Sequence, residues 1–181
     1  GFEWLESLLI GAAISSTDAA SVFSVLRSKK LNLRYGTASI LELESGSNDP
    51  WAYMLTVIIL SVMKGGATAG GFVVSLLAQV FFGVFFGALI SLGAVYLIKR
   101  VRFDAAGFDA IFVTAIAILS YALPSAVGGN GYLSCYIVGI VLGNTKISGK
   151  TALVHFFDGI TGFTQILLFF LLGLLAFPSQ M

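Results

Sequence analysis

The sequence predicts an all-α, polytopic membrane protein with about six transmembrane helices. Of its 181 residues, 57% are hydrophobic and 10% are charged, whereas soluble domains carry about 25% charged residues. The apolar residues form continuous runs such as LLAQVFFGVFFGALISLGAVYLI, not the alternating segments of about ten residues that membrane β-barrels show. Loops rich and poor in basic residues also alternate along the chain, as in polytopic helical proteins.

Composition excludes several function classes. A formal net charge of +1 gives no basic surface for nucleic acid. One cysteine, Cys135, and one histidine, His155, cannot build the multi-ligand sites that hold structural zinc. We therefore expect no nucleic-acid partner and no bound cofactor, and we expect the lipid bilayer to surround the chain.

Six apolar stretches define the predicted helices. They cover about residues 7–26, 37–63, 72–98, 107–123, 125–143 and 158–177. The last four are almost purely apolar, whereas the first two carry polar residues near their centres. Pro124, Gly128 and Gly129 leave little room for a loop, so the helix expected from residue 125 can begin late or be broken.

Basic residues predict the orientation of the chain. They gather in the first, third and fifth loops between the spans: Arg27, Lys29, Lys30 and Arg34, then Lys99, Arg100 and Arg102, then Lys146 and Lys150. The second loop holds only Lys64, and the fourth loop holds no basic residue. The positive-inside rule therefore predicts that the first, third and fifth loops are cytoplasmic.

The first span has a polar centre. It reads IGAAISSTDAASVF, and Asp18 lies about eleven residues from its outer end, which is about 16 Å deep at about 1.5 Å per residue. An Asp at that depth costs about 3 kcal/mol on insertion scales, and such residues usually mark ion paths or proton relays. The alternative is a carboxyl that only hydrogen-bonds a neighbouring helix.

The second span is more polar still. It reads ASILELESGSNDPWAYMLTV and places Asp49 about 20 Å from its cytoplasmic end. Ser45 and Asp49 lie four residues apart, so they share one face of a helix. Pro50 cannot donate to the Gly46 carbonyl, which leaves an oxygen beside a carboxylate as a candidate cation ligand. The alternative is a simple packing kink.

The acids in these two spans have no basic partner at the same depth. Asp18, Glu44 and Asp49 lie at membrane depth, and no Lys, Arg or His does so in any predicted span. Because burial disfavours unpaired anions, the acids hold protons, hold a cation, or pair with a base on a helix outside this chain, and we expect all three to apply. Oxygen ligands of these kinds suit hard cations, and competition between H⁺ and a monovalent cation for one site is sufficient for antiport.

Asp18 within SSTDAASVF, followed about thirty residues later by LELESGSNDP, resembles the monovalent cation:proton antiporter family. The resemblance is to its NhaP-type bacterial branch, related to the Na⁺/H⁺ exchangers, and includes the subgroup assigned to K⁺/H⁺ exchange. The later segments GNGYLSCYIVGIVLGN and QILLFFLLGLLAFPS are similar to the same family, so the resemblance covers essentially the whole chain.

The resemblance implies roles for individual residues. Asp49 would carry the transported proton or cation, and Asn48 would support it in a form typical of electroneutral exchange. Thr17, Asp18 and Ser45 would be further ligands of the transported Na⁺ or K⁺. Glu44 would pair with an Arg on a helix that follows this chain.

The resemblance also implies an architecture of about thirteen helices in two inverted repeats, of which this chain would be a fragment. Residues 1–63 would be half of the ion-transport core, 64–104 a linker helix, and 105–181 scaffold helices that form a homodimer. The missing helices of the same protein would then be a partner, the bacterial inner (plasma) membrane the location, and the fragment alone would not transport.

Three other functions remain as alternatives. An intramembrane aspartyl protease would use Asp18 and Asp49 as acid and base, but the Gly-x-Gly-Asp and Pro-Ala-Leu signatures are missing from this sequence. A non-transporting membrane subunit would use the polar residues only to hold helices together. A cation channel would need a carbonyl filter or an acidic ring, and the sequence shows neither. We therefore predict a transporter, not an enzyme.

Overall fold

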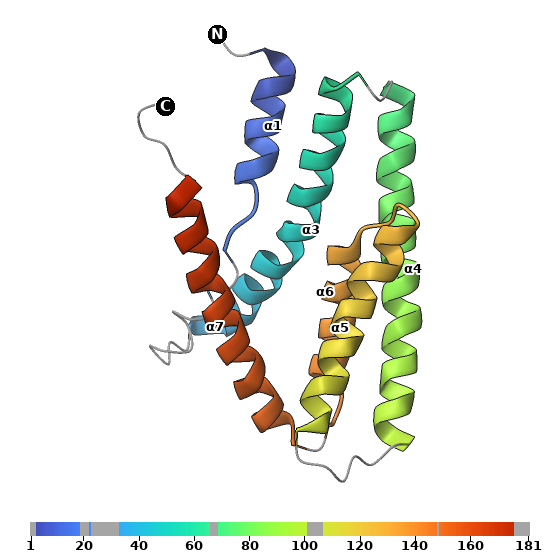
Figure 1. Ribbon diagram of the computed structural model, residues 1–181, viewed down its shortest axis with the longest axis vertical. Helices are drawn as coiled ribbons and strands as arrows, with labels where there is room; N and C mark the ends of the chain where they lie inside the picture. The colour runs from blue at the N-terminus through green and yellow to red at the C-terminus, as the bar shows by residue number, and fades with distance from the viewer. Residues whose placement is uncertain are drawn as a thin grey trace. The chain divides into compact units, whose positions relative to one another are not determined.

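The computed structural model describes residues 3–18, 22, 33–65, 69–100, 107–147 and 149–175. Within these residues it contains six α-helices, one 3₁₀ helix and no strand, so the all-α prediction is confirmed. The elements are α1 (Trp4–Ile14), η1 (Arg34–Gly36), α3 (Thr37–Met63), α4 (Ala69–Arg100), α5 (Phe108–Ala126), α6 (Gly131–Asn144) and α7 (Lys150–Leu175), as Figure 1 shows.

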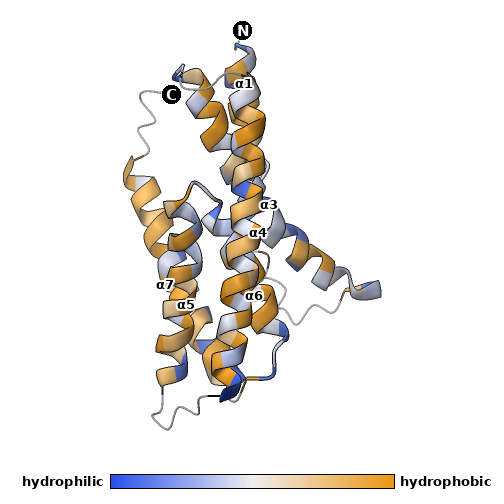
Figure 2. Cartoon of the chain, turned by 90° about the vertical axis from the view of Figure 1, so that its right-hand side faces the viewer, coloured by the Kyte–Doolittle hydropathy of each residue, from blue (hydrophilic) through white to orange (hydrophobic). Residues whose placement is uncertain are grey.

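Three of these helices are long and apolar enough to cross a membrane. They are Gly70–Arg100 within α4, α5 and α7. The helices α1 and α6 are also apolar but shorter, and α3 is 27 residues long with its polar segment near the middle. Apolar residues run along all of the helices in Figure 2. This pattern is that of a polytopic membrane protein.

Most of the predicted helices differ from the observed ones only at their ends. The bounds of α3 are the predicted 37–63. The helix α4 extends to Arg100 because basic residues are favourable at a helix C-terminus even outside the apolar run. The helix α7 starts at Lys150 rather than at 158, since the intervening residues include no proline. The helix α6 starts at Gly131 rather than at 125, where Asn130 caps it by accepting a hydrogen bond from the Leu133 N–H at 3.1 Å.

The prediction of one continuous helix over residues 7–26 is wrong. The helix α1 ends at Ile14, and residues 16–18 are not helical. The Ser15 hydroxyl donates to the Ala12 carbonyl at 2.7 Å, and such side-chain bonds compete with helical ones. Val22 is helical again, and its N–H donates to the Asp18 carbonyl at 3.1 Å. The other residues of this predicted span after Asp18 lie outside the described residues.

The chain divides into two compact units, residues 1–147 and residues 148–181. In the first unit α1 packs against α3, and α4 packs against α5 and most extensively against α6. A buried apolar cluster joins α4, α5 and α6, formed by Ile90, Ala94, Ile116, Val138 and Leu142. The second unit contains α7, none of whose residues is buried within this chain.

Glycines let α6 approach α4 closely. A Cβ atom on Gly83 would lie 2.9 Å from the Asn130 carbonyl oxygen, and one on Gly87 would lie 3.1 Å from Ile137. Close backbone packing of this kind stabilises helix pairs in membranes, where the hydrophobic effect does not drive association. The α4–α6 pair therefore forms a firm support beside α3.

Candidate functional site

The break after α1 brings two hydroxyls to the polar segment of α3. The Ser16 hydroxyl donates to Oδ1 of Asp49. The Thr17 hydroxyl donates to Oγ of Ser45 at 3.0 Å. These bonds join positions that lie 33 and 28 residues apart in the sequence, so the two polar segments form one cluster.

Asn48 makes three side-chain hydrogen bonds in this cluster, two of them with Thr17. Its Nδ2 donates to the Thr17 hydroxyl at 3.0 Å and to Oε1 of Glu44 at 3.1 Å. Its Oδ1 accepts from the backbone N–H of Thr17 at 3.4 Å. The Asn48 side chain thus accepts a hydrogen bond from a backbone N–H that lies beyond the end of α1. This bond explains how the break in the helix is tolerated in a membrane, where backbone groups need hydrogen-bond partners.

The five predicted ion ligands and Glu44 differ in their burial. Ser45 is 2% exposed, and Asn48 and Asp49 are half-buried. Thr17, Asp18 and Glu44 are exposed on this chain. Asp18 follows Thr17 directly and is not helical either. The expectation that the carboxyls of Asp18 and Asp49 share one ion stays a prediction.

Pro50 lies inside α3, one residue after Asp49. It has no N–H to donate to the Gly46 carbonyl, and its ring crowds that carbonyl. The helix α3 is visibly bent partway along its length in Figure 1, and a proline is a sufficient cause for such a bend. Asp49 therefore lies beside the turn of α3 that the proline weakens. The non-helical residues after α1 approach it there, since the Ser16 hydroxyl bonds its carboxylate.

The cluster brings together oxygen atoms of several kinds, and one of its hydroxyls bonds the Asp49 carboxylate. Hydroxyls of Ser16, Thr17 and Ser45, the Asn48 amide and the Asp49 carboxylate are all ligands that hard monovalent cations accept. With a proton on Asp49 the same hydrogen bonds can persist, because a protonated carboxyl still accepts through its second oxygen. The arrangement is thus compatible with a site that alternates between a proton and a cation.

Two residues make hydrogen bonds here that the sequence did not predict, one within the cluster and one beside it. Ser16 lies next to Thr17 in the sequence but was not among the predicted ligands, although its hydroxyl bonds Asp49. Asn130 comes from the start of α6, and its Nδ2 donates to the Pro50 carbonyl at 2.9 Å. The polar run SSTD could have indicated Ser16, but no local signal links Asn130 to a residue 80 positions away.

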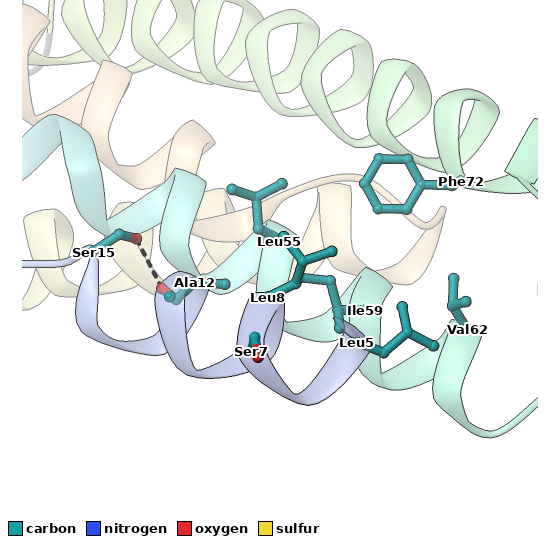
Figure 3. A pocket seen from close by; sticks show the side chains of 10 residues that line it. Leu5, Ser7, Leu8, Ala12, Ser15, Leu55, Ile59, Val62 and Phe72 are labelled. Atoms are coloured by element: carbon teal, nitrogen blue, oxygen red, sulfur yellow. Dashed lines mark hydrogen bonds between the residues drawn. The ribbon is translucent and has the colours of Figure 1, made fainter. Parts of the chain in front are cut away.

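A separate cavity of about 540 Å³ lies between α1, α3 and the start of α4. Figure 3 shows its lining side chains, which come mostly from aliphatic residues and Phe72. The polar side chains among its lining residues are Ser7 and Ser15, and the Ser15 hydroxyl already donates to the Ala12 carbonyl. An apolar cavity of this kind does not offer the oxygen ligands that a cation needs.

Comparison with known proteins gives one family and several relatives. The chain matches the family described as sodium/hydrogen exchanger, transmembrane, over residues 1–181. It is 42% identical to the K(+)/H(+) antiporter NhaP2 of Shewanella oneidensis, covering 98% of this chain and 31% of that protein. It is 36% identical to the K(+)/H(+) antiporter NhaP of Alkalimonas amylolytica, covering 100% and 32%.

A more distant relative is named for a different cation. The chain is 26% identical to the Na(+)/H(+) antiporter NhaS2 of Synechocystis, covering 99% of this chain and 34% of that protein. No solved structure matches the chain. The chain thus spans about a third of the length of the curated relatives that it matches.

Proposed function

This chain belongs to the sodium/hydrogen exchanger family, and from that membership we propose that it is a segment of a longer antiporter that exchanges a monovalent cation for H⁺. The observation that carries the proposal is the cluster in which Ser16 and Thr17 bond the polar side chains of α3. Interrupted helices that meet polar side chains are the usual ion sites of secondary transporters.

We propose Asp49 as the residue that exchanges a proton for the cation. Ser45, Asn48, Thr17 and Asp18 are the proposed further ligands, together with Ser16 because its hydroxyl bonds Asp49. One carboxyl that binds either one proton or one monovalent cation moves equal charge in both directions. The exchange is therefore electroneutral, and an imposed membrane potential should not change its rate.

Potassium is the proposed cation. The relatives that are 36% and 42% identical are named K(+)/H(+) antiporters, whereas the Na(+)/H(+) antiporter is 26% identical. The ligand types do not separate the two ions, because both accept oxygen. Assays with K⁺ and with Na⁺ side by side will assign the substrate.

We propose the rest of the architecture in support of the same function. Residues 1–63 supply half of the transport core, 64–104 a linker helix, and 105–181 scaffold helices of a homodimer in the bacterial inner membrane. The first, third and fifth loops face the cytoplasm. Glu44, which accepts a bond from Asn48, pairs with an Arg of a helix outside this chain.

The direct test is exchange in proteoliposomes. The longer protein that contains this chain is reconstituted with a pH-sensitive dye inside the vesicles, and K⁺, Na⁺ or choline is added outside. K⁺ should drive proton efflux at zero potential, and choline should not. An equal response to choline would contradict the proposal, and a response to Na⁺ alone would reassign the cation.

The 181-residue chain by itself should not exchange ions. The part of the chain that the structure describes contains three helices long enough to span a membrane. The chain covers about a third of the relatives' length, so we expect its site to lack the second half of the fold. Purified chain in the same vesicles should give the choline baseline. Cation-driven pH change from this chain alone would show that the segment is sufficient.

Thr17 should contribute to cation affinity through its hydroxyl. That hydroxyl donates to Ser45 and accepts from Asn48, so Thr17→Val keeps the shape but leaves both partners without this bond. A loss of about 1.4 kcal/mol, within the usual worth of such bonds, raises the KM for the cation about tenfold. Thr17→Ser keeps the hydroxyl and should retain a nearly unchanged KM. Equal KM values in Thr17→Val and the unmodified protein would remove Thr17 from the site.

A further inference from the structure

The helix α6 contacts α3 on both sides of Asp49. Before Asp49, the Tyr136 hydroxyl donates to the Leu43 carbonyl at 3.1 Å. After Asp49, Nδ2 of Asn130 donates to the Pro50 carbonyl at 2.9 Å. The two helices pack against each other in the first unit, so the two bonds act between adjacent elements.

Asn130 uses its polar groups to join three helices. Its side chain is 1% exposed, and a buried amide is costly unless it is hydrogen-bonded. Its Oδ1 caps α6 by accepting from Leu133, and its own N–H donates to the Gln79 carbonyl of α4 at 3.0 Å. The start of α6 is therefore anchored to α4 independently of the bond to Pro50. Because Asn130 is held in this way, its bond to the Pro50 carbonyl ties α3 to α4 and α6.

Tyr136 supports α3 at the preceding turn. A Cβ atom on Gly46 would lie 2.9 Å from Cε2 of the Tyr136 ring, so the ring rests directly on the glycine backbone. Gly46 is also the residue whose carbonyl Pro50 cannot bond. The contacts of α6 thus fall on the turn that the proline weakens.

We propose that Asn130 is a positioning residue for the ion site. By holding the Pro50 carbonyl against the α4–α6 support, it fixes the bend of α3 and so keeps Ser45 and Asp49 opposite Ser16 and Thr17. Tyr136 acts in the same way at the other side of the bend. The inference rests on the proposed function of the cluster but concerns residues that do not touch the ion.

The test separates this role from helix capping. Asn130→Ser keeps a side chain that caps a helix well but is too short to reach the Pro50 carbonyl. Asn144→Ser is the matched control, because Asn144 lies at the other end of α6 and its Nδ2 donates to the Ile140 carbonyl of the same helix at 2.8 Å. Both variants are made in the longer protein that contains this chain.

The transport assay measures two quantities for each variant, the KM for the cation and the maximal rate. Asn130→Ser should raise the KM about tenfold and lower the rate at saturating cation less than about twofold, because misplaced ligands weaken binding. Asn144→Ser should change neither quantity. A lower maximal rate with an unchanged KM would overturn the proposal, since a purely structural defect only removes active protein.

Amide hydrogen exchange provides a readout that does not depend on transport. In Asn130→Ser the amides of α3 just after Pro50 should exchange about tenfold faster, and in Asn144→Ser they should not. Unchanged exchange in Asn130→Ser would overturn the proposal even if the protein transports. If the unmodified protein transports no cation, the proposed function fails, while this measurement still tests whether Asn130 holds α3.

A second variant covers the case in which Asn130→Ser does not fold. Tyr136→Phe removes one hydroxyl from a half-buried ring and leaves the contact with Gly46 in place. It should raise the KM about threefold, with faster amide exchange in the turn that contains Leu43. A wild-type KM and wild-type exchange in this variant would overturn the inference for the first side of the bend.

Discussion

Asp49→Asn in the longer protein is expected to abolish cation-driven proton movement while the protein still folds and inserts. The substitution keeps the size of the side chain, and an amide oxygen can still accept the hydrogen bond from Ser16. It removes the negative charge and the group that binds a proton. Because the proposed exchange needs both, the rate should fall by at least about 100-fold, to the level of empty vesicles.

The matched control for this change is Asp109→Asn. Asp109 lies in the first turn of α5, where a carboxylate interacts favourably with the helix dipole by about 0.3–1 kcal/mol. Loss of this carboxylate in Asp109→Asn should leave the exchange rate within about twofold of that of the unmodified protein. Gel filtration of both variants checks their assembly. Retained exchange in an assembled Asp49→Asn protein would favour the reading in which the polar residues only hold helices together.

A cation that binds at this carboxyl should also stabilise the folded protein. Stabilisation of this kind grows with the ratio of free ligand to its dissociation constant, so it can be observed without transport. The unmodified protein and Asp109→Asn should melt at higher temperature as K⁺ rises, and Asp49→Asn should not. This comparison separates a site that binds without exchanging from one that does not bind.

The helices themselves could be predicted because their signal is local. The range 37–63 could be read as one helix despite Pro50, since apolar residues flank the polar segment on both sides. The late start of α6 also has a local signal, because asparagine is a favoured cap and two glycines precede it. Such features depend on neighbouring residues and are visible in one sequence.

The break after Ile14 could not be predicted, because its compensation comes from elsewhere. The stretch IGAAISSTDAASVF is apolar on average, so hydropathy favours an unbroken helix. The hydrogen bonds that compensate for the break join Thr17 to Asn48 and Ser45, about thirty residues later in the sequence. The contact between Asn130 and Pro50 spans 80 residues and has no local signature either. The two polar segments were therefore visible in the sequence, whereas the hydrogen-bond partner of each group was not.

Gly131→Ala is expected to destabilise the packing of α6 strongly. A Cβ atom at this position would lie 2.6 Å from the Tyr121 carbonyl oxygen and 2.6 Å from Oγ of Ser125. The carbonyl belongs to the backbone of α5 and cannot rotate away as a side chain could. Overpacking of this kind costs about 1–3 kcal/mol, so the detergent-solubilised protein should melt several degrees lower.

The matched control is Gly139→Ala on the same helix. A Cβ atom there would meet no atom within 4 Å, and alanine favours a helix over glycine by about 1 kcal/mol. The control should therefore melt at the same temperature or higher. Equal melting of Gly131→Ala and Gly139→Ala would contradict the close approach of α5 and α6. Because Gly131 adjoins Asn130, a shift of α6 in Gly131→Ala should also raise the KM for the cation, and the control variant should leave it unchanged.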